Sequence, residues 1–169
     1  GDFHEAINIA AVWNLPVIFI IENNGYGLST PTNQQYKCKN LVDKAIGYGI
    51  QGVQVDGNDV IEVYETIKNL KEKIIKGSGP FLVEALTFRI RGHEEASGIK
   101  YVPESLIEKW KKKDPILKLE KQLIKDNIIT EDYIKKIELE FSQKILPVID
   151  KALISPMPSS SEENELNDV

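Results

Sequence analysis

Hydrophobic residues follow two different patterns at the start of the chain. Residues 2–13 place their apolar side chains on one stripe at helical spacing, whereas residues 17–21 are apolar at every position. The stripe predicts a helix, and its many alanines allow close packing against a sheet. The apolar run predicts a strand buried from both sides, which is typical of parallel sheets. Pro16 separates them, because a proline disfavours the helical conformation of its predecessor.

The alternation of helical and strand patterns continues to residue 88. A short helix is predicted at 41–48, strands at 52–55 and 81–88, and a longer amphipathic helix at 60–76. The apolar stripe of that longer helix comprises Val60, Val63, Tyr64, Ile67, Leu70 and Ile74. Regular alternation of helices and strands predicts an α/β fold with a parallel sheet flanked by helices.

The pattern changes after residue 88. Residues 89–103 are a long polar loop without hydrophobic periodicity. Charged amphipathic helices are then predicted at 104–112, 114–126 and 130–154. We therefore expect one domain with residues 1–103 as its α/β part and 104–154 as a helical extension. Residues 155–169 are rich in proline, serine and acidic side chains, which predicts a flexible tail or linker.

Capping residues mark several predicted helix ends. Asn58 or Asp59 is expected to cap the helix at 60–76, and Gly77 to end it in the left-handed conformation. Thr130 is a candidate N-cap for the last helix. Pro147 is expected to kink or break that helix, since it has no amide hydrogen to donate.

Composition and charge narrow the function classes. The chain has 169 residues, 41% of them hydrophobic, and a net charge of −5, so a basic nucleic-acid-binding surface is not expected. No apolar run approaches the roughly 20 residues of a membrane span, and no signal peptide is evident. The single cysteine, Cys38, excludes an internal disulfide and suits a reducing compartment. The chain does not start with Met, so we expect it to be part of a longer polypeptide.

Two adjacent asparagines follow the first predicted strand, at the start of a predicted loop over residues 23–35. In parallel sheets ligands bind beyond the carboxyl ends of strands, and an amide oxygen of Asn24 is the kind of donor that Mg²⁺ prefers. The alternative is that Asn24-Gly25 only forms a turn, for which this dipeptide is common. His93 lies in a polar loop with Gly92 beside it, and loops of this kind often carry function.

Two segments carry a resemblance to a known family. The segments "GDFHEAINIAAVWNLPVIFIIENNGYGLSTP" and "GPFLVEALTFRIRGHEEASG" resemble the alpha subunit of the decarboxylating first component of 2-oxoacid dehydrogenases, which binds thiamine diphosphate. The resemblance extends over roughly residues 1–153. The family motif runs from Gly-Asp-Gly to Asn-Asn, and only its back half is present. The aspartate of that motif, a metal ligand in the family, is therefore expected upstream of Gly1.

The resemblance implies roles for particular residues. Asn24 would give its side-chain oxygen and Tyr26 its backbone carbonyl to Mg²⁺. His93 would be both a catalytic and a cofactor-binding residue, lying over the diphosphate and the reacting carbon. Arg91 could add charge to the same loop, although many relatives have histidine there. Some animal relatives carry a regulated serine directly after the loop histidine, where this chain has Glu94.

The resemblance also implies a reaction and partners. The family decarboxylates a 2-oxoacid with thiamine diphosphate and Mg²⁺, then passes the acyl group to a lipoyl group on a transacylase component. A beta subunit, either separate or fused, supplies the glutamate that activates the cofactor, so this piece alone should be inactive. Such enzymes are cytoplasmic in bacteria and lie in the mitochondrial matrix in eukaryotes. The alternative is a non-catalytic interaction module or relic without a complete cofactor site. Without upstream strands, an unpaired sheet edge is expected near residues 17–21.

Overall fold

The computed structural model describes residues 1–94, 96, 98–157, 161 and 166. The predicted tail at 155–169 falls mostly outside these residues. The chain divides into two compact units, residues 1–121 and 122–169, which are described separately. Within the part of the chain that the structure describes, no helix has the length and apolar character needed to cross a membrane.

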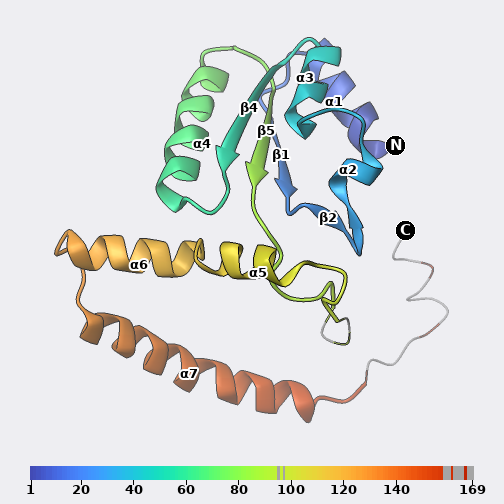
Figure 1. Cartoon of the computed structure of the whole chain (residues 1–169). Coiled ribbons are helices and arrows are strands. Elements are labelled where there is room, and N and C mark those ends of the chain that lie inside the picture. Colours follow the sequence, from blue (N-terminus) through green and yellow to red (C-terminus); the bar gives the residue numbers. More distant parts are fainter. Residues whose placement is uncertain (95, 97, 158–160, 162–165, 167–169) are drawn as a thin grey trace. The chain divides into compact units, whose positions relative to one another are not determined.

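The first unit is built on a parallel sheet (Figure 1). Strands β1 (Ile18–Asn23), β5 (Phe81–Leu86) and β4 (Gln51–Asp56) lie side by side in the order β1-β5-β4, and both pairs are parallel. This confirms the predicted α/β fold. The strand buried on both faces is β5, whose first five residues are all buried, and not β1 as predicted. In the described structure β1 pairs on one side only and Ile20 is 54% exposed, which confirms the expected unpaired edge.

Helices cover both faces of this sheet, as Figure 1 shows. Helix α4 (Val60–Ile75) packs on one face, where Leu70 joins a buried cluster with Val55, Phe81, Val83 and Ala85. Helices α1 (Asp2–Val12) and α3 (Lys44–Gly47) pack on the other face, where Ile7 and Ala45 contact Leu82. The predicted stripe of α4 was too wide, because Val60 and Tyr64 are 44% and 62% exposed.

The predicted helix ends are largely confirmed. Asp59 caps α4 by accepting hydrogen bonds from the backbone N–H groups of Ile61 and Glu62, and Gly77 follows the helix with a φ of +88°. Thr130 caps α7 (Glu131–Leu153) through the backbone N–H of Tyr133. Of the two effects predicted for Pro147, a kink or a break, the break is wrong, since α7 continues through it to Leu153. A single missing donor costs about 3 kcal/mol, which the many other hydrogen bonds of a long helix can offset.

Shorter elements connect these layers. The segment 23–35, predicted as a loop, contains the small hairpin β2 (Tyr26–Gly27) and β3 (Thr30–Pro31) followed by α2 (Thr32–Gln35). The 3-10 turn η1 (Leu41–Asp43) precedes α3. Helices α5 (Glu104–Lys111) and α6 (Pro115–Lys125) follow the polar loop after β5.

Candidate functional site

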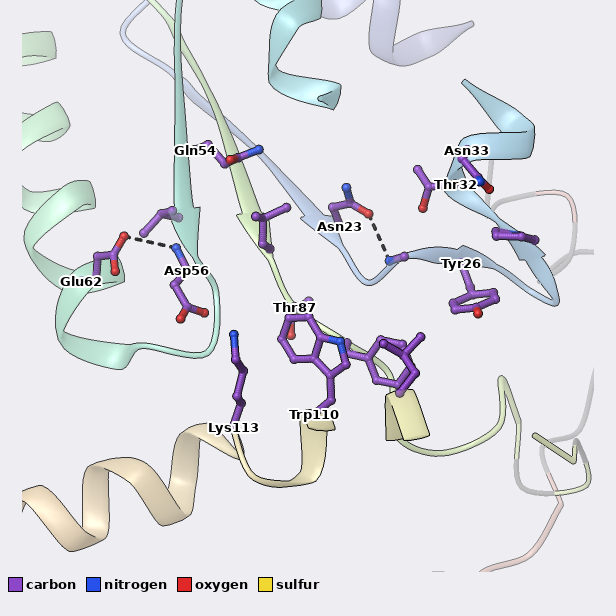
Figure 2. Close-up of a pocket in the computed structure, with 16 residues that line it drawn as sticks. Asn23, Tyr26, Thr32, Asn33, Gln54, Asp56, Glu62, Thr87, Trp110 and Lys113 are labelled. Carbon is purple, nitrogen blue, oxygen red and sulfur yellow. Dashed lines mark hydrogen bonds between the residues drawn. The ribbon is translucent and has the colours of Figure 1, made fainter. Parts of the chain in front are cut away.

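A cavity of about 740 Å³ opens at the carboxyl ends of the three strands (Figure 2). It is lined by Asn23 at the end of β1, by Tyr26 of β2, by Asp56 at the end of β4, by Thr87 beyond β5, and by Trp110 of α5. The edge formed by the carboxyl ends of parallel strands is where α/β proteins bind ligands. The polypeptide immediately after β1 therefore occupies the expected place for a site.

The adjacent asparagines, Asn23 at the end of β1 and Asn24 directly after it, form consecutive turns. The Oδ1 atom of Asn23 accepts a hydrogen bond from the backbone N–H of Gly25 at 3.1 Å, and Oδ1 of Asn24 accepts one from Tyr26 at 3.0 Å. Gly25 has a φ of +82°, a conformation that other residues rarely adopt. The backbone carbonyl of Gly25 in turn accepts from the N–H of Thr32 at 2.9 Å. Both asparagines therefore form turns, and each amide oxygen keeps its second lone pair for another partner.

The donor chemistry of this turn fits Mg²⁺. The amide oxygen of Asn24 and the backbone carbonyl of Tyr26 are hard, neutral oxygen donors, which Mg²⁺ accepts together with phosphate oxygens. Both residues line a small hollow of about 190 Å³ beside β1. Among the described residues, no three His, Cys, Asp or Glu side chains gather where they could hold a metal. The candidate donors in this chain are thus neutral oxygens.

His93 is held by Arg89. The Nη1 atom of Arg89 lies 3.0 Å from Nδ1 of His93, and a guanidinium can only donate. Nδ1 must therefore accept, which assigns the ring hydrogen to Nε2. The Nη2 atom of Arg89 also donates to the carbonyl of Leu28 at 2.6 Å and to the hydroxyl of Tyr101 at 3.1 Å. One side chain thus ties the His93 loop to the hairpin that follows Asn24.

The structure brings the candidate residues to one region but not into one cavity. Asn24 and Tyr26 share the small hollow, whereas His93 lines a separate depression of about 410 Å³ formed by its own loop. Arg91 lines that depression and is exposed. Arg89 is a functional candidate that was not predicted from the sequence. Its position three residues after the end of the buried strand β5 was the available signal.

Aromatic rings fix the hairpin against the loop and α5. The ring centroid of Tyr26 lies 6.2 Å from that of Phe88, in an edge-to-face arrangement, and 5.8 Å from that of Tyr101. Phe88 in turn stacks on Trp110 at 5.5 Å. Such aromatic pairs contribute about 0.5–1.5 kcal/mol beyond area burial. The tyrosine ring therefore positions the backbone at Tyr26.

Asn58 anchors the turn between α5 and α6 to the same edge of the sheet. It is 5% exposed, donates from Nδ2 to the carbonyl of Lys113 at 2.8 Å, and accepts at Oδ1 from the hydroxyl of Thr87 at 2.7 Å. From the sequence, Asn58 is predicted only as a possible helix cap. The cap is its neighbour Asp59, whose pKa is lowered chiefly by the hydrogen bond from Lys118 and further by backbone N–H groups.

Comparison with known proteins identifies the family. The family model described as "Dehydrogenase E1 component" matches residues 1–161 of the chain. The chain belongs to the dehydrogenase E1 component family. In this E1 chain the match includes the turn after β1, the loop of His93 and all the strands of the sheet.

Three curated relatives show which E1 components are similar. The alpha subunit of 2-oxoisovalerate dehydrogenase from Bacillus subtilis is 39% identical over 153 residues, covering 90% of this chain and 45% of the relative. The alpha subunit of acetoin:2,6-dichlorophenolindophenol oxidoreductase from the same organism is 37% identical, with coverages of 96% and 48%. The pyruvate dehydrogenase E1 alpha subunit of Rickettsia bellii is 33% identical, with coverages of 96% and 50%. The chain thus spans at most about half the length of these relatives.

Proposed function

We propose that this E1 chain is part of an alpha subunit that decarboxylates a 2-oxoacid and delivers the acyl group to a lipoyl group of a transacylase partner. The E1 family implies thiamine diphosphate as cofactor, and the relatives are alpha subunits of such dehydrogenases. A beta subunit, separate or fused, would complete the site. Residues 1–103 would carry the cofactor-binding part, residues 104–154 a helical extension of the same domain, and residues 155–169 a flexible tail or linker.

The observation that carries this proposal is the link through Arg89. It joins the His93 loop to the hairpin after Asn24, with contacts of 3.0 Å to His93 Nδ1 and 2.6 Å to the Leu28 carbonyl. A candidate metal-binding turn and a candidate hydrogen-bond donor are thereby kept at the same edge of the sheet. This is the arrangement that a metal–diphosphate group would need, with the metal on one side and a donor on the other.

Each residue then has a defined role. Asn24 would give its amide oxygen, and Tyr26 its backbone carbonyl, to an Mg²⁺ ion that also binds the diphosphate. His93 would donate from Nε2 to a phosphate oxygen or to negative charge that develops on the substrate. When bound, thiamine diphosphate supplies the nucleophilic carbon and the electron sink for decarboxylation. The chain's own residues bind and orient that group.

The test uses the full-length protein together with its beta partner. We expect thiamine diphosphate binding that requires Mg²⁺, and release of CO₂ from pyruvate, 2-oxoisovalerate or a related 2-oxoacid. Asn24→Ala should abolish Mg²⁺-dependent cofactor binding, measured by calorimetry, because it removes a direct metal ligand. Asn8→Ala is the matched control, since Asn8 is an exposed asparagine on α1. It should bind the cofactor as the wild type does.

Two results would count against the proposal in different ways. Unchanged cofactor binding by Asn24→Ala would contradict the assignment of the metal site. Failure of the wild-type complex to bind thiamine diphosphate or to decarboxylate any 2-oxoacid would contradict the function itself. The second result would favour a non-catalytic interaction module.

A further inference from the structure

Glu84 is a carboxylate in the middle of the central strand. It is 1% exposed and lies on the same face of the sheet as Leu82, the face covered by α1 and α3. Burying an ionised carboxylate costs several kcal/mol unless its oxygens receive hydrogen bonds. A glutamate at this position therefore needs an explanation that packing alone does not give.

The hydrogen bonds to Glu84 come from three different segments. Oε1 accepts from Nδ2 of Asn23 at 2.7 Å, whereas Oε2 accepts from the backbone N–H of Val42 at 3.1 Å and from Nε2 of Gln54 at 3.0 Å. These donors belong to β1, η1 and β4. The turn η1 can approach β4 closely because residue 52 of that strand is glycine. A Cβ atom at Gly52 would lie 2.6 Å from Cγ2 of Val42 in η1. The carboxylate thus joins both neighbouring strands to the turn above them.

These donors also decide the charge of Glu84. Burial raises the pKa of Glu84, but the hydrogen bonds from Asn23, Val42 and Gln54 together lower it below its ordinary value. The side chain is therefore an ionised carboxylate at neutral pH. In that form both oxygens can only accept hydrogen bonds.

An acceptor at this position fixes the orientation of the Asn23 amide. Asn23 must turn Nδ2 toward Glu84, so its oxygen faces the opposite way. Figure 2 shows the hydrogen bond between that oxygen and the backbone N–H of Gly25. The bond from Gly25 to Asn23 Oδ1, at 3.1 Å, holds the residue whose φ of +82° reverses the chain. The next turn, closed by Asn24 Oδ1 and the Tyr26 N–H, begins from that geometry.

We propose that Glu84 is a positioning residue for the metal-binding turn, acting through Asn23 on Gly25 and so on the oxygens of Asn24 and Tyr26. This inference rests on the proposed function of that turn as an Mg²⁺ site. It assigns different roles to the adjacent asparagines: Asn23 orients the turn and Asn24 binds the ion. Glu84 itself does not touch the metal or the cofactor.

A carboxylate is required because an amide cannot serve all of these donors. A glutamine at position 84 would present one oxygen and one NH₂ group. If the NH₂ group faces Asn23, two donors meet, unless Asn23 flips and turns its own NH₂ toward the N–H of Gly25. If the NH₂ group of the glutamine instead faces Val42 and Gln54, the hydrogen bonds that these two residues donate are lost. Glu84→Gln therefore changes the hydrogen-bond pattern with almost no change in volume.

The experiment measures metal affinity rather than turnover. The full-length protein with its beta partner is saturated with thiamine diphosphate, and free Mn²⁺ is followed by electron paramagnetic resonance during a Mn²⁺ titration. Residues that orient metal ligands typically change affinity by about 10–100-fold when mutated. We expect Glu84→Gln and Asn23→Ala each to raise the Kd for Mn²⁺ within that range, and the double variant to be no worse than the weaker-binding single variant.

Gln54→Ala is the matched control. It removes another hydrogen bond to the same carboxylate but leaves the bond from Asn23 intact. We expect lower thermal stability with an unchanged Kd for Mn²⁺. A similar loss of Mn²⁺ affinity in Gln54→Ala would show that the sheet edge had merely loosened, and would overturn the inference.

The remaining outcomes are also decisive. Wild-type affinity for Mn²⁺ in either Glu84→Gln or Asn23→Ala would overturn the positioning role while leaving the proposed function intact. If Glu84→Gln does not fold, Asn23→Ala decides the question by the same criterion. A wild-type complex that binds no Mn²⁺ in the presence of thiamine diphosphate would overturn the proposed function and this inference with it.

Discussion

Replacing Arg89 with lysine should release the His93 loop from the hairpin. The guanidinium of Arg89 donates to three acceptors at once, namely His93 Nδ1, the carbonyl of Leu28 and the hydroxyl of Tyr101. A lysine keeps the charge, but its ammonium is a compact point at the end of a flexible stem and cannot span the same fork. We expect one of these contacts to persist and the others to be lost.

The magnitude follows from the hydrogen bonds that disappear. Each contributes about 0.5–1.5 kcal/mol net, so the loss of two gives about 1–3 kcal/mol. These contacts are open to solvent, so the free-energy loss should lie toward the lower end of that range. Since 1.4 kcal/mol corresponds to a factor of ten, the open form of the loop should become about tenfold more populated.

Limited proteolysis of the full-length protein measures this opening. Trypsin cleavage after Lys100, an exposed residue in the same loop, should accelerate about tenfold in Arg89→Lys, because cleavage follows the population of the open form. Arg91→Lys is the matched control, as it makes the same exchange at an exposed position in that loop. Equal cleavage rates in the wild type and Arg89→Lys would show that Arg89 does not hold the loop closed. Equal acceleration of cleavage in Arg89→Lys and Arg91→Lys would also contradict a specific role of Arg89 in holding the loop.

Other predictions concern the cap of α4 and the turn after β1. Asp59→Ala should lower the stability of the protein by about 0.5–2 kcal/mol in thermal unfolding, because it removes an N-cap. The pKa of Asp59 is lowered, chiefly by Lys118, so its stabilising effect is present above about pH 4 and fades at lower pH; Asp59→Asn should weaken that dependence. Gly25→Ala and Gly49→Ala both place a side chain at positive φ without a clash, and each should cost about 1–2 kcal/mol. Only Gly25→Ala should also weaken cofactor binding, and equal cofactor affinity in the two variants would contradict a role for this turn.

Much of the fold could be predicted because the relevant signals are local. The apolar run before Asn23 and the run at 81–86 each mark a strand, and Asp59, Gly77 and Thr130 mark helix ends through their own backbone chemistry. The central position of β5 could not be predicted in this way. Strand order depends on pairing between segments that are about 60 residues apart, as with Ile18 and Phe81.

The candidate site was predictable only in part. The adjacent asparagines at the end of β1 and the loop of His93 were evident from residue type and resemblance. Arg89 and Glu84 were not, because their roles depend on partners far away in the sequence: Leu28 for Arg89, and Asn23 and Val42 for Glu84. An acidic residue inside the apolar strand "FLVEAL" was the available signal for Glu84. A buried charge in a strand requires partners, even where the sequence does not name them.

We propose above that the turn after β1 holds the metal ion of a thiamine diphosphate site. The most direct test is a crystal structure of the full-length protein with its beta partner, thiamine diphosphate and Mn²⁺ in place of Mg²⁺, with the ion located by its anomalous scattering. We predict an anomalous peak at bonding distance, roughly 2.0–2.3 Å, from both Asn24 Oδ1 and the Tyr26 carbonyl oxygen. A peak bound elsewhere, with the turn unchanged and these oxygens uncoordinated, would contradict it.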